Sequence, residues 1–325
     1  MKKNILTSAV IIVLLCITSF SCKKDKPASA SVEQKVFTND IDNFWIAYDN
    51  IKKTDDNTEQ LSLINSLYIE KGTEGLRAFI KERDLSAELW VNLINTYPKF
   101  WNSIRANTLS IKAKAKEIDL NILKFKTIYP ELKEGKIYFT IGGLTSGGTI
   151  SDNLVLIGTE VVTGNPTTDV SEFPDEWLGK IFKNQNPDNI ISVSIHEYVH
   201  TQQKGDISSL LGAVINEGSC DFIAELVTGK PLQTSYMQYG KDHEEELKEK
   251  FEQEMFTDAI DNWLFNGSKV EYADLGYFMG YQICKSYYQN STNKKEAIKQ
   301  IIELDYSDNN AVEDFLAQSK YYSQP

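Results

Sequence analysis

Hydrophobic and polar residues follow a helical pattern over much of the first half of the chain. In the segment NDIDNFWIAYDNI, the apolar residues Phe44, Trp45 and Tyr48 recur at three- and four-residue spacing, which predicts a helix with one buried face. The segment SAELWVNLINTYPKFWNSI repeats this pattern, with a break at Pro98. We therefore expect a helical segment over residues 36–130, in which the aromatic side chains form core rather than a ligand site.

The pattern changes between residues 136 and 162. The segment KIYFTIGGLTSGGTISDNLVLIGTEVV has two β-rich runs around a glycine-rich turn, which predicts a small sheet. The glycines, Gly142 to Gly148, lack the Lys-Ser/Thr ending of a phosphate-binding loop. We expect them instead to let the backbone approach another group closely.

Two capped helices are predicted after this sheet. The first is NPDNIISVSIHEYVHTQQKG, with Asn186 as N-cap, Pro187 at the first helical position and Gly205 at the end. The second runs from a cap at Asp206 to Gly229. A short connection favours antiparallel packing of the two helices. With further helical segments towards the C-terminus, the pattern predicts a mainly helical α+β fold.

Composition and charge narrow the possible functions. The chain has 325 residues, of which 41% are hydrophobic and 25% charged, as in ordinary globular proteins. Its formal net charge is -12, which argues against a sequence-independent grip on nucleic acid, because such binding needs a basic surface.

The N-terminus, MKKNILTSAVIIVLLCITSFSC, has a basic start, an apolar run and small residues before Cys22. This predicts a signal peptide over residues 1–21, too short to span a bilayer comfortably. The ending SFSC resembles a bacterial lipobox, and the resemblance implies acylation of Cys22. The polar residues 22–35 would then be a lipidated tether in the cell envelope, most simply at the outer membrane. The sequence does not decide between the periplasmic face and the cell surface. The alternative is a plain cleaved signal.

Besides Cys22, two cysteines lie outside the predicted leader, Cys220 and Cys284. An exported protein is permitted a disulfide, so the two could form one. Two buried free thiols are the simpler interpretation, and the sequence leaves the choice open.

The segment HEYVH contains two of the three histidines in the chain. On a helix, His196 and His200 lie one turn apart on the same face and can hold one Zn²⁺ through their ring nitrogens. Glu197 lies beside them, within reach of a water molecule at the metal. A catalytic zinc site needs three protein ligands and one open position, so a third ligand is required.

The partner helix offers that third ligand in the segment INEGSCDF. Sixteen residues separate His200 from Glu217, enough for a turn and a return along an antiparallel helix. Asp221 follows one helical turn later on the same face and can accept the second N–H of His196. The sequence therefore predicts Zn²⁺ bound by His196, His200 and Glu217, with Asp221 behind His196.

HEYVH followed by NEGSCD resembles the gluzincin pattern of thermolysin-like peptidases. Residues 136–288 also resemble predicted zinc-dependent proteases related to gliding-motility lipoproteins of Bacteroidetes. The resemblance implies a zincin-like metallopeptidase domain over residues 131–325, with Glu197 as the general base. Gluzincins also use a Tyr or His to stabilise the oxyanion. No histidine matches that role, and Tyr277 and Tyr281 in GYFMGYQ are candidates by position alone.

Two functions follow from this site. The first is zinc-dependent hydrolysis of a peptide or protein in the envelope, with the strand in NLVLIGTEVV along the edge of the cleft, where an extended substrate could add to it. The alternative is a non-catalytic zinc-binding lipoprotein, a structural or assembly component of a motility or secretion machine. A structural zinc site usually has four protein ligands, and no obvious fourth appears, which favours an open site. A glycan- or solute-binding lipoprotein, with an aromatic-lined cleft and no metal, is a third possibility.

Overall fold

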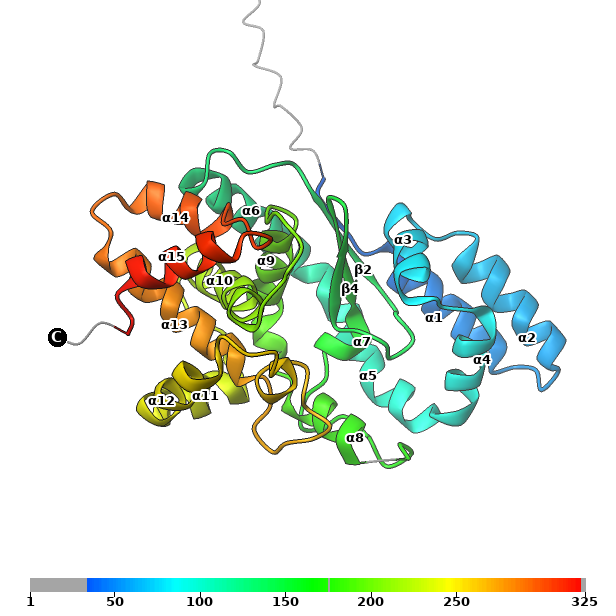
Figure 1. Cartoon of the computed structure of the whole chain (residues 1–325). Helices are drawn as coiled ribbons and strands as arrows, with labels where there is room; N and C mark the ends of the chain where they lie inside the picture. Colours follow the sequence, from blue (N-terminus) through cyan, green and yellow to red (C-terminus); the bar gives the residue numbers. More distant parts are fainter. Residues whose placement is uncertain (1–33, 175, 323–325) are drawn as a thin grey trace, which may run out of the picture. The chain divides into compact units, whose positions relative to one another are not determined.

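A computed structural model describes residues 34–174 and 176–322, and the chain from Gln34 onward forms one compact unit. The predicted signal peptide, Cys22 and nearly all of the tether lie outside the described residues. The architecture is mainly helical α+β with one four-stranded sheet, which confirms the fold class at this level (Figure 1).

The first half of the unit is helical up to residue 128. Pro98 ends one helix and opens the next, as its missing N–H and fixed φ predict. The large aromatic side chains of this region, among them Phe44, Trp90 and Trp101, are fully buried, which confirms their interpretation as core. The elements are α1 (Asn39–Ile51), α2 (Asn57–Ile64), the π-helical turn η1 (Asn65–Ile69), α3 (Glu74–Arg83), α4 (Ala87–Thr96), α5 (Pro98–Ser110), the 3₁₀ turn η2 (Ile111–Ala113) and α6 (Ala115–Ile128).

The sheet has the strand order β1-β2-β4-β3. Its strands are β1 (Val36–Phe37), β2 (Lys136–Thr140), β3 (Gly148–Ser151) and β4 (Leu154–Gly158). The two predicted β-rich runs are β2 and β4, which pair in parallel, while β3 pairs antiparallel with β4. The sequence missed β1, which has two residues and no pattern of its own, and β3, which emerges from the glycine-rich turn.

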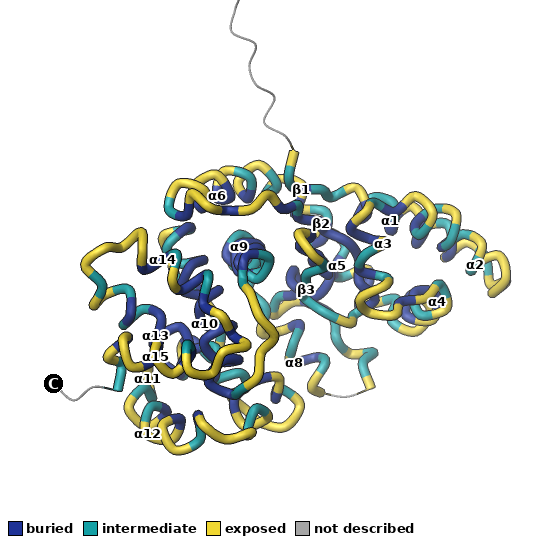
Figure 2. Tube along the Cα trace, turned by 45° about the horizontal axis from the view of Figure 1, so that its top comes forward, coloured by how far each residue is buried: buried dark blue, intermediate teal, exposed yellow. Residues whose placement is uncertain are grey.

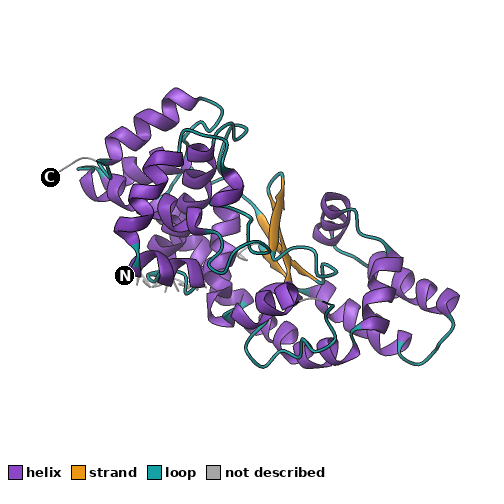
Figure 3. Ribbon diagram, turned by 60° about the horizontal axis from the view of Figure 1, so that its bottom comes forward, coloured by secondary structure: helices purple, strands orange, loops and turns teal. Residues whose placement is uncertain are grey.

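The two faces of the sheet pack against different helices. Tyr138 and Leu156 form a small cluster with Phe79 of α3. Because successive side chains on a strand point to opposite faces, Phe139 and Ile157 point the other way, into the main core. The sheet therefore lies between the N-terminal helices and those of the second half (Figure 3).

The second half adds the helices that carry the candidate chemistry. They are α7 (Thr159–Val162), α8 (Glu176–Asn184), the 3₁₀ turn η3 (Pro187–Asn189), α9 (Ile190–His200), α10 (Leu210–Thr228), α11 (Ser235–Asp242), α12 (Glu244–Glu254), the 3₁₀ turn η4 (Ile260–Asn262), α13 (Leu275–Asn290), α14 (Lys294–Ile302) and α15 (Asn309–Ser319). The boundary predicted near residue 130 falls in the loop between α6 and β2, and it stays a prediction about segment organisation.

The predicted ends of α9 are half correct. Asn186 caps the 3₁₀ turn η3, accepting a hydrogen bond from the Asp188 N–H at 3.0 Å, and this turn leads directly into α9, which itself begins at Ile190. The helix, however, ends at His200, and Gly205 lies further on, with φ of 79° in the connecting loop. Gly205 does adopt a left-handed conformation, but it lies in the loop after α9 and not at the C-terminal end of the helix, where it was predicted.

The start of α10 also differs from its prediction. The N-cap is Ser209, whose hydroxyl accepts the Gly212 N–H at 3.1 Å, and not Asp206. Both residue types cap helices well, so composition alone does not choose between them. The predicted end is confirmed, because Gly229 adopts φ of 85° at the C-cap.

Helices α10 and α13 cross in close contact at two glycines. A Cβ on Gly280 would overlap the carbonyl oxygen of Val214, and a Cβ on Gly218 would overlap the backbone nitrogen of Tyr281. Only glycine allows backbones to approach this closely. This crossing holds the first turn of α13 beside the helix that carries Glu217.

Within the described part of the chain, no helix combines the length and apolarity needed to cross a bilayer.

Candidate metal centre

Helices α9 and α10 bring three potential ligand atoms together. The Nε2 atoms of His196 and His200 lie 3.2 Å apart. Oε2 of Glu217 lies 3.5 Å from the Nε2 of His196 and 3.3 Å from that of His200. These three residues are the predicted ligands, and the structure places their atoms at the corners of one nearly equilateral triangle.

The triangle has the size that zinc requires. Zinc bonds of about 2.0–2.2 Å at a tetrahedral angle separate neighbouring ligand atoms by roughly 3.3–3.5 Å. The three separations here, 3.2, 3.3 and 3.5 Å, lie in that range or within 0.1 Å of it. The residues present therefore fit a zinc ion without rearrangement.

Cys220 offers a second possible set of ligands with the same two histidines, because one donor atom from each of the three lies within 4.8 Å of the others. Its Sγ, however, lies 3.5 Å from Nδ1 of His200, the ring nitrogen that points away from His196. One ion between the Nε2 atoms would therefore not meet this sulfur. The Nε2 atoms therefore converge with the Glu217 carboxylate rather than with this sulfur.

His196 is oriented from behind by a carboxylate. Its Nδ1 lies 2.8 Å from Oδ1 of Asp221, and the other oxygen of Asp221 accepts the Tyr236 hydroxyl at 2.9 Å. Since the carboxylate only accepts, the imidazole N–H must be on Nδ1. The lone pair of Nε2 is then directed into the triangle, as a metal ligand requires.

His200 is oriented in the same way by Gln203. The Nε2 of Gln203 donates to the Asn216 carbonyl at 2.9 Å and to the Ser219 hydroxyl at 2.9 Å. A carbonyl only accepts, so the amide must present Oε1 to His200, whose Nδ1 lies 2.7 Å away. His200 thus carries its N–H on Nδ1 and its lone pair on Nε2.

The electrostatics of the site favour a positive charge inside the triangle. Burial acts to raise the pKa of Glu217, but the two neighbouring imidazoles outweigh it and hold that pKa well below its usual range. Burial acts to lower the pKa of His196 and His200, yet Cys220, Glu217 and, for His196, Asp221 raise both. The acidic groups around the rings thus stabilise a cation at this point.

Glu197 lies against β3 and not in the triangle. Its carboxylate occupies the space that a Cβ on Gly148 would fill. This confirms that the glycine-rich segment lets the backbone approach another group closely. Among the described residues, Glu197 has no hydrogen-bond or ion-pair partner, and burial raises the pKa of its carboxyl group. It is a free carboxylate beside the candidate metal position.

The strand beside this carboxylate is β3, the edge of the sheet. The prediction that the strand in NLVLIGTEVV lies along the cleft edge is wrong, because that strand is β4, which pairs with β2 on one side and β3 on the other. The sequence could not reveal this, since β3 comes from a glycine-rich segment with weak strand propensity.

The two candidate tyrosines of α13 have different positions. The Tyr277 ring lies 6.1 Å from the His196 ring, centroid to centroid, at an interplanar angle of 22°, and 5.3 Å from the Tyr236 ring. The Tyr281 hydroxyl donates to Glu225 and accepts from Lys285 at 2.8 Å. The structure therefore brings Tyr277 to the site and directs Tyr281 elsewhere.

Sequence reasoning missed Gln203 and Tyr236. Gln203 follows His200 by three residues, but Gln202 comes directly before Gln203, and nothing in the sequence shows which of the two amides contacts the imidazole. Tyr236 lies in α11, outside both motif helices, so no local spacing connects it to Asp221.

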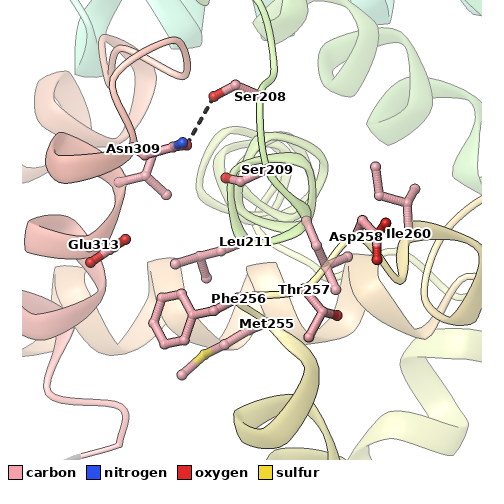
Figure 4. A pocket seen from close by; sticks show the side chains of 12 residues that line it. Ser208, Ser209, Leu211, Met255, Phe256, Thr257, Asp258, Ile260, Asn309 and Glu313 are labelled. Carbon is pink, nitrogen blue, oxygen red and sulfur yellow. Dashed lines mark hydrogen bonds between the residues drawn. The ribbon is translucent and has the colours of Figure 1, made fainter.

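The cysteines and a pocket at the N-terminal end of α10 add nothing to this site. Cys220 and Cys284 are free and buried, in agreement with the simpler of the two interpretations. A pocket of about 330 Å³ lies at the N-terminal end of α10, between Leu211, Phe256 and Glu313 (Figure 4). Neither motif histidine lines it, and the Ser208 hydroxyl donates to the Asn309 side chain at one margin of it, at 2.9 Å. It is a separate surface feature.

The fold and the site together define a class: a mainly helical α+β protein with a largely buried His-His-Glu centre between two antiparallel helices. The chain belongs to the family of gliding motility protein GldB, whose sequence profile matches residues 21–274. It is thus related to gliding-motility lipoproteins, and the family places it at the cell envelope. No curated protein and no solved structure matches the chain.

The matched range covers the predicted lipidation site and part of the predicted metal site. It includes Cys22, the three residues of the triangle, and Asp221 and Gln203, which orient the two imidazoles. It ends at residue 274, so Tyr277 and Tyr281 lie beyond it.

Proposed function

We propose that this chain is an envelope lipoprotein that acts as a zinc-binding component of the gliding machinery. The observation that carries the zinc assignment is the triangle of two imidazole nitrogens and one carboxylate oxygen, with separations of 3.2–3.5 Å. The family match supports a place in the gliding machinery, and protein partners in that machinery are part of the proposal. The lipid anchor on Cys22 and an outer-membrane location are part of the proposal.

The roles of the residues follow from their contacts. His196, His200 and Glu217 would hold the ion, and Asp221 and Gln203 keep the two imidazoles in the tautomer that binds it. When bound, zinc supplies a Lewis acid, which lowers the pKa of water and polarises a carbonyl group.

Metal analysis of the protein lacking residues 1–22 tests this assignment. We expect about one Zn²⁺ per chain in the wild type and a loss of zinc in His196→Ala and Glu217→Ala, because a three-ligand site tolerates no missing ligand. His243→Ala is the matched control, since this third histidine stacks on Tyr239, away from the triangle. Full zinc occupancy in both ligand variants would refute the site.

The anchor has its own test. The wild type should take up labelled palmitate in cells, and Cys22→Ser should not, because the thiol carries the lipid. Equal labelling of the two proteins would remove the anchor from the proposal without affecting the zinc site.

A second candidate function, zinc-dependent peptide hydrolysis by a zincin-like domain, is favoured by one observation. Glu197 is neither a member of the triangle nor paired with any described residue, and its carboxylate packs against Gly148 of β3, an edge strand of the sheet. In this proposal, an extended peptide or protein substrate pairs with β3.

The proton transfer in this hydrolysis would depend on Glu197. Its carboxylate would take a proton from a water molecule whose oxygen forms the new bond to the carbonyl carbon. It would then deliver that proton to the amine nitrogen as the C–N bond breaks. The Tyr277 ring beside His196 makes this residue, rather than Tyr281, the candidate for contact with the developing oxyanion.

Glu197→Gln separates the two candidate functions. The variant should keep its zinc, and loss of a general base should slow hydrolysis by about a hundred- to ten-thousandfold. A digest of a peptide library with the pure protein, run beside complementation of a deletion strain, is decisive. If neither form cuts any peptide and the Gln variant restores motility, the protein is a non-catalytic component.

A further inference from the structure

Helix α6 carries an exposed face that combines apolar and basic side chains. Its buried face is built from Ile118, Ile122 and Phe125, which are at most 2% exposed. On the opposite face, Leu120 and Leu123 are 50% and 47% exposed. Neighbouring apolar side chains that are exposed to water mark a candidate interaction surface, because they contribute no burial to the core.

Two lysines flank these leucines. Lys116 and Lys124 lie four residues before and four residues after Leu120, so all three side chains lie along one stripe of the helix. Both lysines are exposed, and neither forms an ion pair with a carboxylate of the described residues; Lys124 donates to the Asn121 amide at 3.3 Å.

The acids around α6 do not cancel this charge. Residues 111–129 carry five lysines and two acidic residues, a net charge of +3 in a chain of net charge -12. The carboxylates nearby face other lysines: Glu117 pairs with Lys114 at 3.7 Å, Glu131 pairs with Lys299 at 3.6 Å, and Glu134 and Asp119 face Lys35. The two lysines of the stripe are therefore available to an external anion.

The chain enters the fold beside this helix. Strand β1, which begins at Val36, contacts α6, and the Asp119 carboxylate of α6 faces the backbone of Lys35. Figure 2 shows the largely exposed outer side of α6 next to the point where the described chain begins. Eleven residues separate Cys22 from Gln34, and a chain of that length spans at most about 40 Å when fully extended.

We propose that the exposed face of α6, formed by Lys116, Leu120, Leu123 and Lys124, rests on the anionic phospholipid surface to which the chain is tethered. Apolar tips flanked by lysines are the composition of helices that lie in a membrane interface, where the leucines enter the headgroup region and the ammonium groups meet lipid phosphates. Two leucines give a small contact, so the acyl chains hold the protein and the α6 face sets its orientation.

This inference uses the anchor at Cys22 and is independent of the zinc chemistry. A protein that binds no zinc would leave it standing, and the palmitate experiment tests the anchor separately.

The acylated full-length protein in vesicles of phosphatidylethanolamine and phosphatidylglycerol provides the test. An environment-sensitive fluorophore is attached through Leu123→Cys, and a second protein carries it through Val270→Cys, a site of similar exposure at 46%. Attachment is selective because Cys220 and Cys284 are buried. We expect emission at position 123 to shift to shorter wavelength and to be quenched by spin-labelled lipid, with no such change at position 270.

Charge variants test the role of the lysines. Lys116→Glu/Lys124→Glu should abolish the quenching at position 123, since each lysine near an anionic surface contributes about fivefold to the binding constant. Lys230→Glu/Lys241→Glu, which alters two exposed lysines elsewhere, should leave the quenching unchanged.

Three outcomes would overturn the proposal. The first is no quenching at position 123, and the second is equal quenching at positions 123 and 270. The third is a label at position 123 that is exposed to solvent when the purified protein is in lipid vesicles with no other protein, but protected in cells. That result would assign the face to a protein partner.

Discussion

The candidate metal centre and the α6 face depart from the usual distribution of side chains in opposite directions. At the centre, polar groups are buried: His196 is 8% exposed and Asp221 1%. On α6, apolar groups are exposed: Leu120 is 50% exposed. Soluble proteins bury apolar groups and expose charged ones, so both regions carry information that an ordinary core or surface does not.

The difference lies in how each departure is compensated. At the centre, every buried imidazole N–H has an acceptor, and the remaining ring nitrogens converge on one point. That internal network stabilises the groups and prepares them for a cation. No described residue covers the two leucines of α6, and for this reason we inferred an external surface for them. A buried polar cluster thus indicates a ligand, and an exposed apolar stripe indicates a surface.

Among the tests of this contrast between the two regions, removal of the metal is expected to have the largest effect. Zinc that binds only the folded state stabilises it by about 4 kcal/mol when the free ion is a thousandfold above its Kd. A chelator should therefore lower the melting temperature of the wild type, measured by calorimetry. His196→Ala, which lacks a ligand, is the control and should not respond. An unchanged wild-type transition would mean that no ion contributes to the stability of the centre.

Asp221→Asn should weaken zinc binding by roughly ten- to a hundredfold, because an amide has one acceptor oxygen and cannot accept from both the His196 N–H and the Tyr236 hydroxyl. Competition with a chromophoric chelator measures the affinity. Glu225→Gln, one turn further along α10, contacts Tyr281 and not the histidines, and serves as the control. Equal losses in the two variants would indicate a general effect of charge rather than orientation.

Gln203→Met should cost about tenfold in zinc affinity, the lower end of the range for groups that orient a ligand. The substitution keeps the side-chain length but removes the acceptor for His200. Gln203→Glu restores the acceptor and should recover most of the affinity, even though it loses the donors to Asn216 and Ser219. A Met variant that binds zinc like the wild type would leave Gln203 with a structural role only.

The smallest effect is expected on α6. Leu120→Ser/Leu123→Ser should change the free energy of unfolding by no more than about 0.5 kcal/mol per residue, as exposed substitutions do, and should leave zinc affinity unaltered. Urea denaturation measures the first quantity and chelator competition the second. A loss of several kcal/mol would show that the two leucines are packed, and would remove the contrast between the two regions.

Much of the site was accessible from local spacing. The interval of four residues between His196 and His200 fixes their common face on any helix, and the predicted antiparallel return places Glu217 opposite them. The interval between Glu217 and Asp221 repeats the argument one turn later. These predictions needed only the helical period and a short connection between two helices.

Other parts of the site were not accessible in this way. The choice between Tyr277 and Tyr281 depends on how α13 crosses α10, which is set by Gly218 and Gly280 on different helices. The edge position of β3 depends on strand pairing, and strand order has no local signature in a segment of two to five residues.

The sequence by itself determined the helix faces, the presence of a lipobox-like leader and the set of groups able to hold a metal. These are local properties, because a helix repeats every 3.6 residues whatever surrounds it. Only the tertiary structure decided that Gln203 and Tyr236 reach the centre, that Glu197 lies against β3, and that no described residue covers the apolar stripe of α6. Those facts depend on which elements pack together, and packing is decided by the shape and burial of the whole core rather than by the spacing within any one segment.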